Sequence, residues 1–262
     1  MKLELKGRNA LVCGASEGIG AAIARQLAKI GANVTILSRN KDKIDKQLAN
    51  LDTSQGNTHD WVVADLSDPD VAASEVRRRI DDGRNYHVLV NNSGGPPPGA
   101  ITDAKISDFQ SAIRAHLFAS QLLTRELVPG MKSDGWGRII NIISVGARRP
   151  IDNLGVSNTV RGAMMSWSKT LATELAPYGI TVNNILPGHT DTSRLRSLME
   201  KKSKKSSKSI QEIEAEMQAL NPMGRFGKPE ELGYLGAFLA SDYASYITGV
   251  SIPVDGGFLK CL

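Results

Sequence analysis

The chain has 262 residues, of which 41% are hydrophobic and 5% aromatic, and its formal net charge is +5. This length is enough for one α/β domain with a full core. No run of about 18 apolar residues predicts a membrane span, and the N-terminus runs into a predicted strand without the pattern of a signal peptide. The two cysteines make no disulfide framework, so we expect a cytoplasmic protein.

The positive charge is spread along the chain. The sequence has no stripe of aromatic and basic residues, so we predict no nucleic-acid binding. We predict no metal site either. One basic cluster stands out, and we interpret it as a solvated helix surface, with an acidic partner as the alternative. Its lysines are Lys201, Lys202, Lys204, Lys205 and Lys208.

Short apolar runs rich in β-branched residues alternate with longer stretches of helical spacing. The runs predict seven strands: NALVCGA, NVTILSR, HDWVVAD, YHVLVNNS, GRIINIIS, GITVNNILPG and GVSIPVDGG. The helical stretches are Ala21–Ile30, about Lys41–Leu51, Pro69–Asp82, Ser107–Met131, Thr159–Pro177 and Glu230–Ala240. This alternation predicts βαβ units, a mostly parallel sheet and one domain over 1–262.

Two segments need separate comment. Ser157 and Asn158 are residue types that favour the N-cap of a helix, and apolar residues follow at helical spacing. Between LPGHTDT and NPMGRFG lies a polar, helix-like insertion, 193–220, directly after a predicted strand. Because ligands bind beyond the carboxyl ends of strands in an open parallel sheet, we expect this insertion to act as a lid.

A glycine-rich turn, CGASEGIG, follows the first strand and opens the first helix. Its glycines are Gly14, Gly18 and Gly20. Glycine permits a tight turn and a close approach of the backbone to a pyrophosphate, and the helix N-terminus supplies free N–H groups. A glycine trio is also what a plain strand-to-helix turn needs, but the strand before it and the helix after it favour nucleotide binding.

The spacing G-x3-G-x-G resembles that of the short-chain dehydrogenase/reductase family, and the resemblance extends over nearly the whole chain. NNSG (91–94), ADL (64–66), GITVNNILPG (179–188) and ITGVSIPVDGG (247–257) are similar to family motifs. The resemblance implies a three-layer, doubly wound Rossmann fold with a seven-stranded sheet. It also implies a set of cofactor contacts at Gly14, Ser16, Gly18, Ile19, Gly20, Ser38, Arg39, Asp65, Leu66, Asn92, Gly94, Arg161, Pro187, Gly188, Thr190 and Thr192.

The end of the second strand, VTILSRN, indicates which dinucleotide binds. NAD-binding proteins place a carboxylate there for the ribose 2′-OH, whereas NADP-binding proteins use a basic residue for the 2′-phosphate. Here Ser38 takes the acidic position and Arg39 follows it, and Ser16 could add a hydroxyl. A guanidinium can pair with a phosphate through two hydrogen bonds, so we predict NADP(H). The alternative is that Arg39 is an ordinary surface arginine.

The resemblance also implies catalytic positions, and most of them carry unusual residues. Ser144 matches the family serine, which stabilises the substrate oxygen. Ser157 and Arg161 stand where the family has its tyrosine acid and its lysine, and His116 stands where it has an asparagine. A serine is a much weaker acid than tyrosine, and arginine stays protonated, so neither can do the usual work unaided. His116 is therefore the expected proton source, directly or through water.

Two further cations, Arg148 and Arg149, follow Ser144 in the loop that borders the family's substrate site. If they converge with Arg161 and His116, the substrate is anionic, for instance a carboxylate, a phosphate or an acyl thioester of coenzyme A or acyl carrier protein. The alternative is that both point to solvent. The proline-rich loop NSGGPPPG (92–99) adds a stiff wall beside the nicotinamide end.

The sequence as a whole predicts an NADP(H)-dependent oxidoreductase that interconverts a carbonyl and an alcohol, with activity similar to a 3-oxoacyl-[acyl-carrier-protein] reductase and an atypical proton donor. The alternative is a degraded, cofactor-binding protein that acts as a sensor or as the inactive partner in an oligomer. The C-terminal VDGGFLKCL resembles the family segment that packs between subunits, which implies a homo-oligomer, a tetramer by analogy.

Overall fold

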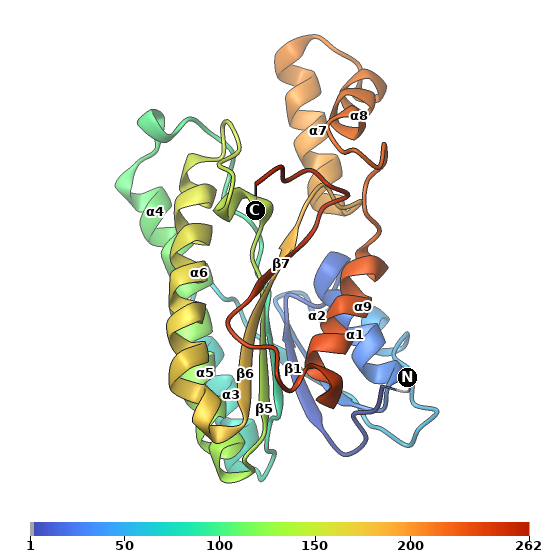
Figure 1. Ribbon diagram of the computed structural model, residues 1–262, viewed down its shortest axis with the longest axis vertical. Coiled ribbons are helices and arrows are strands. Elements are labelled where there is room, and N and C mark those ends of the chain that lie inside the picture. Colours follow the sequence, from blue (N-terminus) through green and yellow to red (C-terminus); the bar gives the residue numbers. More distant parts are fainter. Residues whose placement is uncertain (1–2, 262) are drawn as a thin grey trace.

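A computed structural model describes residues 3–261, apart from the side chain of Lys205. Its strands are β1 Asn9–Cys13, β2 Asn33–Ser38, β3 Asp60–Val63, β4 Val88–Asn91, β5 Gly137–Ile142, β6 Ile180–Pro187 and β7 Ser251–Val254. They form one sheet in the order β3-β2-β1-β4-β5-β6-β7, and every neighbouring pair is parallel. The doubly wound, seven-stranded sheet that the sequence predicted is confirmed (Figure 1).

Helices cover both faces of the sheet. They are α1 Gly18–Lys29, α2 Lys41–Leu48, α3 Pro69–Asp81, α4 Ile106–Ile113, α5 Ala119–Ser133, α6 Gly155–Leu175, α7 Ser193–Ser206, α8 Ile210–Ala219 and α9 Pro229–Ala240. Figure 1 shows α1, α2 and α9 on one face and α3, α5 and α6 on the other. This is the three-layer arrangement of a Rossmann fold.

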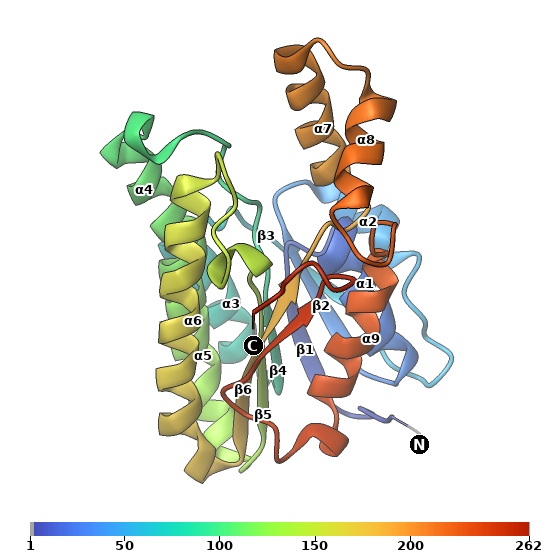
Figure 2. The ribbon, with the colours of Figure 1, turned by 45° about the horizontal axis from the view of Figure 1, so that its top comes forward.

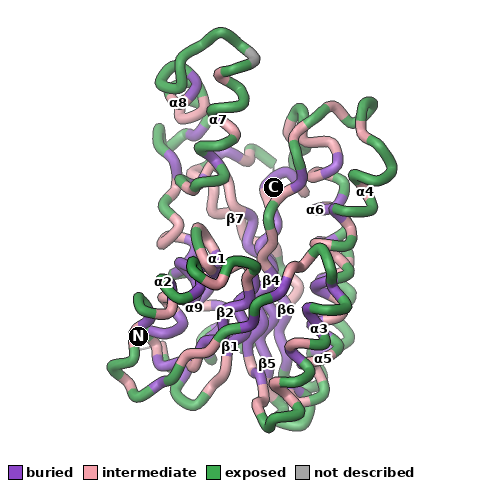
Figure 3. Tube along the Cα trace, turned by 180° about the vertical axis from the view of Figure 1, so that it is seen from behind, coloured by how far each residue is buried: buried purple, intermediate pink, exposed green. Residues whose placement is uncertain are grey.

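Alternate residues of each strand enter the two halves of the core. On β1, Ala10 and Val12 pack with α1 and α9, while Leu11 and Cys13 pack with α3 and α5. All four side chains are at most 1% exposed. A strand buried on both faces needs an almost continuous apolar run, which explains why these strands lack polar alternation (Figure 3).

The lid-like insertion forms an antiparallel pair of helices, α7 and α8, which projects from the body (Figure 2). A small apolar cluster holds it together, with Leu195 and Met199 from α7, Ile213 from α8 and Phe226 beyond them. The lysine cluster lies along this pair: Lys202 and Lys208 pair with Glu216 of α8. Lys205 lies outside the described side chains.

Two predicted helix boundaries are wrong. The helix α6 begins at Gly155 after Leu154, so Ser157 and Asn158 lie inside its first turn rather than at its N-cap. Asn158 instead exchanges hydrogen bonds with the backbone of Ile151, at 3.3 and 2.9 Å, and so fastens the preceding loop to the helix. The long helix expected over 107–131 is interrupted by a π-helical turn, Arg114–Phe118, between α4 and α5.

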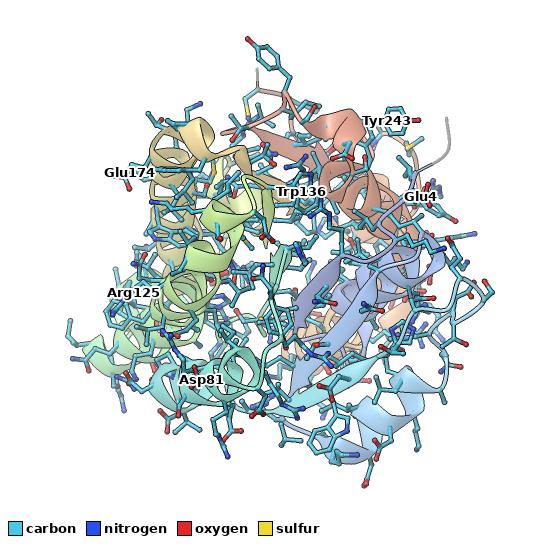
Figure 4. The ribbon with its side chains drawn as sticks, turned by 90° about the horizontal axis from the view of Figure 1, so that it is seen from below. Glu4, Asp81, Arg125, Trp136, Glu174 and Tyr243 are labelled. Carbon is cyan, nitrogen blue, oxygen red and sulfur yellow. The ribbon has the colours of Figure 1, made fainter. Side chains whose placement is uncertain are left out.

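At the amino end of β5, one arginine ties several loops together. Arg138 is 2% exposed and donates to the carbonyl oxygens of Gly137, Gly179 and Ser241, at 2.9, 3.3 and 3.4 Å. Its guanidinium also stacks 4.2 Å from the ring centre of Trp136. Figure 4 labels Trp136. Arg138 therefore donates to backbone acceptors of three separate segments at this end of the sheet.

We expect Arg138→Ala to lower the free energy of unfolding by roughly 3–5 kcal/mol, because it leaves buried carbonyls without donors and opens a cavity. Urea denaturation measures the change. Arg125→Ala, at an exposed position of α5, is the control and should stay within about 0.5 kcal/mol of the wild type. Equal losses in the two variants would contradict this role for Arg138.

Candidate functional site

The strand order reverses between β1 and β4, and the crevice of an open α/β sheet lies at that point, beyond the carboxyl ends. The chain leaves β1 for α1 on one face and leaves β4 for α4 and α5 on the other. The ends of β5 and β6 continue the same edge. Almost all the residues singled out in the sequence lie along this edge.

The glycine-rich turn after β1 leaves no room for side chains. A Cβ on Gly14 would lie 2.7 Å from the carbonyl oxygen of Asn92, and one on Gly20 would lie 2.5 Å from that of Gly14. Gly14 and Gly18 also have positive φ angles of 56° and 61°. The N-cap residue of α1, Glu17, makes no side-chain cap, so the first N–H groups of the helix are free to bind an anion. Ile19 packs against the core and anchors this turn.

Asn92, directly after β4, holds the turn in shape. Its side-chain amide donates to the carbonyl oxygens of Cys13 and Gly14, at 3.3 and 3.1 Å. The segment after β6 forms the opposite wall of the cradle. Its last residue, Thr192, caps the N-terminus of α7. The methyl group of Thr192 would lie 3.5 Å from a Cβ on Gly18. The turn therefore fits a dinucleotide pyrophosphate.

The rest of that segment, 187–192, is fixed by packing and by backbone bonds. Pro187 ends β6, and Gly188 lies so close to β7's end that a Cβ would come within 2.7 Å of Asp255. Thr190 forms a parallel bridge with Gly227. These contacts set where α7 begins relative to the crevice.

Ser16, Ser38 and Arg39 form a small polar corner at the end of β2. The Ser38 hydroxyl donates to the Ser16 hydroxyl at 2.9 Å. The Arg39 side chain is 74% exposed and lies 3.6 Å from the Asp65 carboxylate, a loose pairing that leaves it free to turn toward a phosphate. No carboxylate occupies position 38, so the corner fits a 2′-phosphate better than a free 2′-hydroxyl.

Ser144 follows β5 and caps a 3-10 turn, Val145–Ala147. Its side-chain oxygen accepts the N–H of Gly146 at 3.0 Å. Because that bond uses a lone pair of the oxygen, the hydroxyl hydrogen stays free to donate to a substrate oxygen.

Ser157 and Arg161 lie one turn apart on α6. Ser157 is partly exposed, whereas Arg161 is only 9% exposed and donates to the carbonyl oxygen of Ile142, at the end of β5, at 2.8 Å. Burial, together with the positive charge of Arg194, lowers the pKa of Arg161 to about 10. Its guanidinium is therefore still protonated at neutral pH and cannot shuttle protons there.

The π-helical turn carries His116 into the interior, where it is 4% exposed. Its Nδ1 forms a hydrogen bond with the Ser93 hydroxyl. The ring also forms a hydrogen bond with the backbone of Gly94. Burial, with the nearby charge of Arg161, lowers the pKa of His116 to about 2. A desolvated imidazole between cations stays neutral, and the role of His116 as the proton source stays a prediction.

Arg148 and Arg149 do not converge with Arg161. Arg148 donates to the carbonyl oxygen of Ser251, on β7, at 3.0 Å. Arg149 donates to that of Phe258 at 3.4 Å and stacks on its ring. Both side chains are exposed, and both hold the C-terminal segment in place. They therefore neither converge with Arg161 and His116 nor simply point to solvent, the two alternatives that the sequence left open.

A different arginine takes their place. Arg194, in the first turn of α7, donates to the carbonyl oxygen of Pro96 at 2.7 Å and lies near enough to lower the pKa values of Arg161 and His116. The sequence predicts a lid over 193–220 but does not indicate which of its side chains faces the body. The sequence holds a signal for this position, because Arg194 lies two residues after Thr192, the threonine that closes the cradle.

A cavity of about 10 Å³ lies beside His116 and Arg161, and its volume suits one water molecule. Its polar lining includes Asn91, Ser93, His116 and Arg161, and Leu66 and Cys13 contribute apolar walls. The side-chain oxygen of Asn91 is buried and lacks a hydrogen-bond donor. A water here would satisfy it.

Comparison with known proteins agrees with this geometry. A family model described as "Enoyl-(Acyl carrier protein) reductase" matches residues 14–259. The NADPH-dependent reductase BacG of Bacillus subtilis is 35% identical over 97% of this chain and 99% of its own. The chain is a short-chain dehydrogenase/reductase. The 3-oxoacyl-[acyl-carrier-protein] reductase FabG of Rickettsia conorii is also 35% identical, over 98% of this chain and 99% of its own.

Solved structures of other short-chain dehydrogenases/reductases share the whole fold. The L-sorbose reductase of Gluconobacter frateurii, crystallised with NADPH and L-sorbose, superposes with a TM-score of 0.93 at 32% identity and covers 100% of both chains. YwfH, an NADPH-dependent reductase of bacilysin biosynthesis, superposes with a TM-score of 0.91 at 33% identity, over 98% of this chain and 100% of its own. Among the described residues, no helix is long and apolar enough to cross a membrane.

We expect Arg39→Gln to weaken NADPH binding by about 10-fold and to leave NADH binding unchanged, because only the 2′-phosphate needs the guanidinium. Titration of nicotinamide fluorescence measures both dissociation constants. Lys46→Gln, which removes an exposed cation near the end of α2, is the control and should alter neither. Equal weakening of both nucleotides by Arg39→Gln would count against the polar corner.

We expect the stability of the wild type to fall more steeply with acid than that of His116→Asn. The pKa of His116 is about 2 in the folded chain and near its ordinary 6.5 in the unfolded one, so the unfolded state binds more protons between these values. Stability is therefore lost as pH falls below about 6.5, by up to about 1.4 kcal/mol per pH unit for this group. Urea denaturation at about pH 7 and about pH 5 measures it, and parallel losses in the two proteins would refute the buried, neutral imidazole.

Proposed function

We propose that the chain is an NADP(H)-dependent reductase that interconverts a carbonyl and an alcohol. The observation that carries the proposal is the alignment of three features along one sheet edge: the glycine cradle after β1, the polar corner after β2, and the free hydroxyl of Ser144 after β5. The first two fit the phosphates of NADP(H). The third lies where a carbonyl beside the nicotinamide would need a hydrogen-bond donor.

NADPH, when bound, supplies the hydride to the carbonyl carbon. The Ser144 hydroxyl donates to the carbonyl oxygen, and the positive charge of Arg161 stabilises the negative charge that develops there. The resulting alkoxide takes a proton that comes from water, relayed by the hydroxyl of Ser144 or Ser157. In sum, carbonyl, NADPH and one proton give alcohol and NADP⁺.

His116, which the sequence predicts as the proton source, takes a positioning role in this proposal. Its ring is neutral and engaged with Ser93 and Gly94, so it positions the loop that follows β4 rather than delivering the proton directly. The cavity beside it lets a water reach Arg161. Ser157 and Arg161, in the positions of the family tyrosine and lysine, orient the substrate and cofactor.

The similarity to FabG supports a 3-oxoacyl thioester as one substrate candidate, and the similarity to L-sorbose reductase supports a small ketone as another. The proposal includes a homotetramer, which light scattering tests. It also includes a single domain over 1–262, which limited proteolysis tests.

A cofactor-binding protein without turnover is the second candidate. The observation that favours it is that neither Arg161, protonated at neutral pH, nor His116, neutral there, can pass a proton as a tuned tyrosine does. Such a protein would bind NADPH tightly and act as a sensor or as the inactive partner in an oligomer. Tight binding with no NADPH oxidation on any carbonyl would favour it.

We expect Ser144→Ala to lower kcat for carbonyl reduction by about 10²–10³-fold and to leave the dissociation constant of NADPH unchanged, because the hydroxyl acts on the substrate oxygen only. NADPH oxidation with a panel of ketones and 3-oxoacyl thioesters measures it. Ser166→Ala, at an exposed position of α6, is the control and should keep full activity. A wild-type rate that the Ser144 variant retains would overturn this assignment.

A further inference from the structure

The loop that follows β5 begins at the Ser144 hydroxyl, and one side chain of α6 fastens its far end. Asn158 accepts a hydrogen bond from the N–H of Ile151 at 3.3 Å and donates to the carbonyl oxygen of Ile151 at 2.9 Å. An amide that bonds both backbone groups of one residue fixes the position and the orientation of that residue. Among the described residues, these are the only hydrogen bonds between the loop, 145–151, and α6.

The same amide borders the turn inside the loop. A Cβ on Gly146 would lie 2.8 Å from the side-chain oxygen of Asn158 and 3.3 Å from the Ser144 hydroxyl oxygen, so no side chain fits between the glycine and these two groups. The N–H of Gly146 donates to the Ser144 oxygen at 3.0 Å. Asn158 therefore lies against the residue whose N–H holds the Ser144 hydroxyl.

The orientation of this hydroxyl is decisive for the chemistry. A neutral O–H group stabilises a developing negative charge only when its hydrogen points at the substrate oxygen from hydrogen-bond distance. A displacement of about 1 Å at such a group can cost roughly 10²-fold in rate. The bond from Gly146 occupies one side of the Ser144 oxygen and so directs the hydrogen elsewhere. Any movement of Gly146 would release that constraint.

We propose that Asn158 is a positioning residue of the reductase, which acts through Gly146 to hold the Ser144 hydroxyl toward the substrate carbonyl. This inference rests on the proposed reductase function and adds a residue to it. Asn158 directly follows Ser157 in the chain, so one side chain ties the loop of the first hydroxyl to the helical turn that carries the second. It makes no contact with the substrate in this assignment.

The first experiment follows NADPH oxidation with a panel of ketones. We expect Asn158→Ala to lower kcat about 10- to 100-fold and to leave the dissociation constant of NADPH unchanged, because the amide acts on Ser144 and not on the cofactor cradle.

Asn33→Ala is the matched control. The Asn33 amide also makes two hydrogen bonds, to Asn9 at 2.9 Å and from the N–H of Thr58 at 2.8 Å, but it lies at the amino end of β2. This variant should lose stability as Asn158→Ala does and keep the kcat of the wild type.

A double-mutant cycle shows whether Asn158 acts through Ser144. In the Ser144→Ala background, Asn158→Ala should change kcat by less than about 2-fold, since no hydroxyl remains to be positioned. An anchor that only stabilises the fold would cost the same factor in both backgrounds.

Gly146→Ala provides a second perturbation should Asn158→Ala fail to fold. Its new methyl group would displace the Asn158 amide or the Ser144 hydroxyl, so kcat should again fall, by about 10-fold, with NADPH binding unchanged.

Hydrogen exchange resolved to single amides separates this inference from the reductase function. We expect Asn158→Ala to speed exchange of the Gly146 N–H about 10-fold, while Asn33→Ala leaves it unchanged. That result supports the positioning of Ser144 even if no carbonyl is turned over, in which case only the reductase proposal fails. Unchanged exchange at Gly146, a wild-type kcat in Asn158→Ala, or equal factors in the two backgrounds of the cycle would each overturn the role of Asn158.

Discussion

Burial of the sheet on both faces is the constraint on which the rest of the structure depends. Most side chains of the central strands enter one of two apolar layers, so polar chemistry gathers at the strand ends and in the loops that leave them. All the groups assigned to the cofactor and the substrate lie along that one edge. The parallel direction of the strands places the ends of β1, β2, β4, β5 and β6 there together.

One polar feature does cross the buried sheet, and it shows how strict this constraint is. Asn91, Asn141 and Asn184 lie opposite one another on neighbouring strands, and their side-chain amides donate in series at 2.9 and 3.0 Å. The series ends on Ser168 and Ser251. At its other end, the oxygen of Asn91 faces the small cavity beside His116. Within this series every amide nitrogen finds an acceptor, and the oxygen that lacks a donor, that of Asn91, lies at the site.

Electrostatics at the site follows from the same burial. Desolvation holds His116 neutral and lowers the pKa of Arg161, and each effect is strengthened by another cation nearby.

The sequence by itself determined the fold and the cofactor cradle, because both depend on local patterns. Strand periodicity, glycine spacing and the residue at position 38 act within a few positions of one another. It could not place Arg148, Arg149 and Arg194, since the direction of a long side chain depends on what packs around it. Nor could it foresee the π-helical turn that buries His116, or the start of α6 at Gly155. The tertiary structure decided the charge state of the site, because desolvation arises only when distant segments pack together.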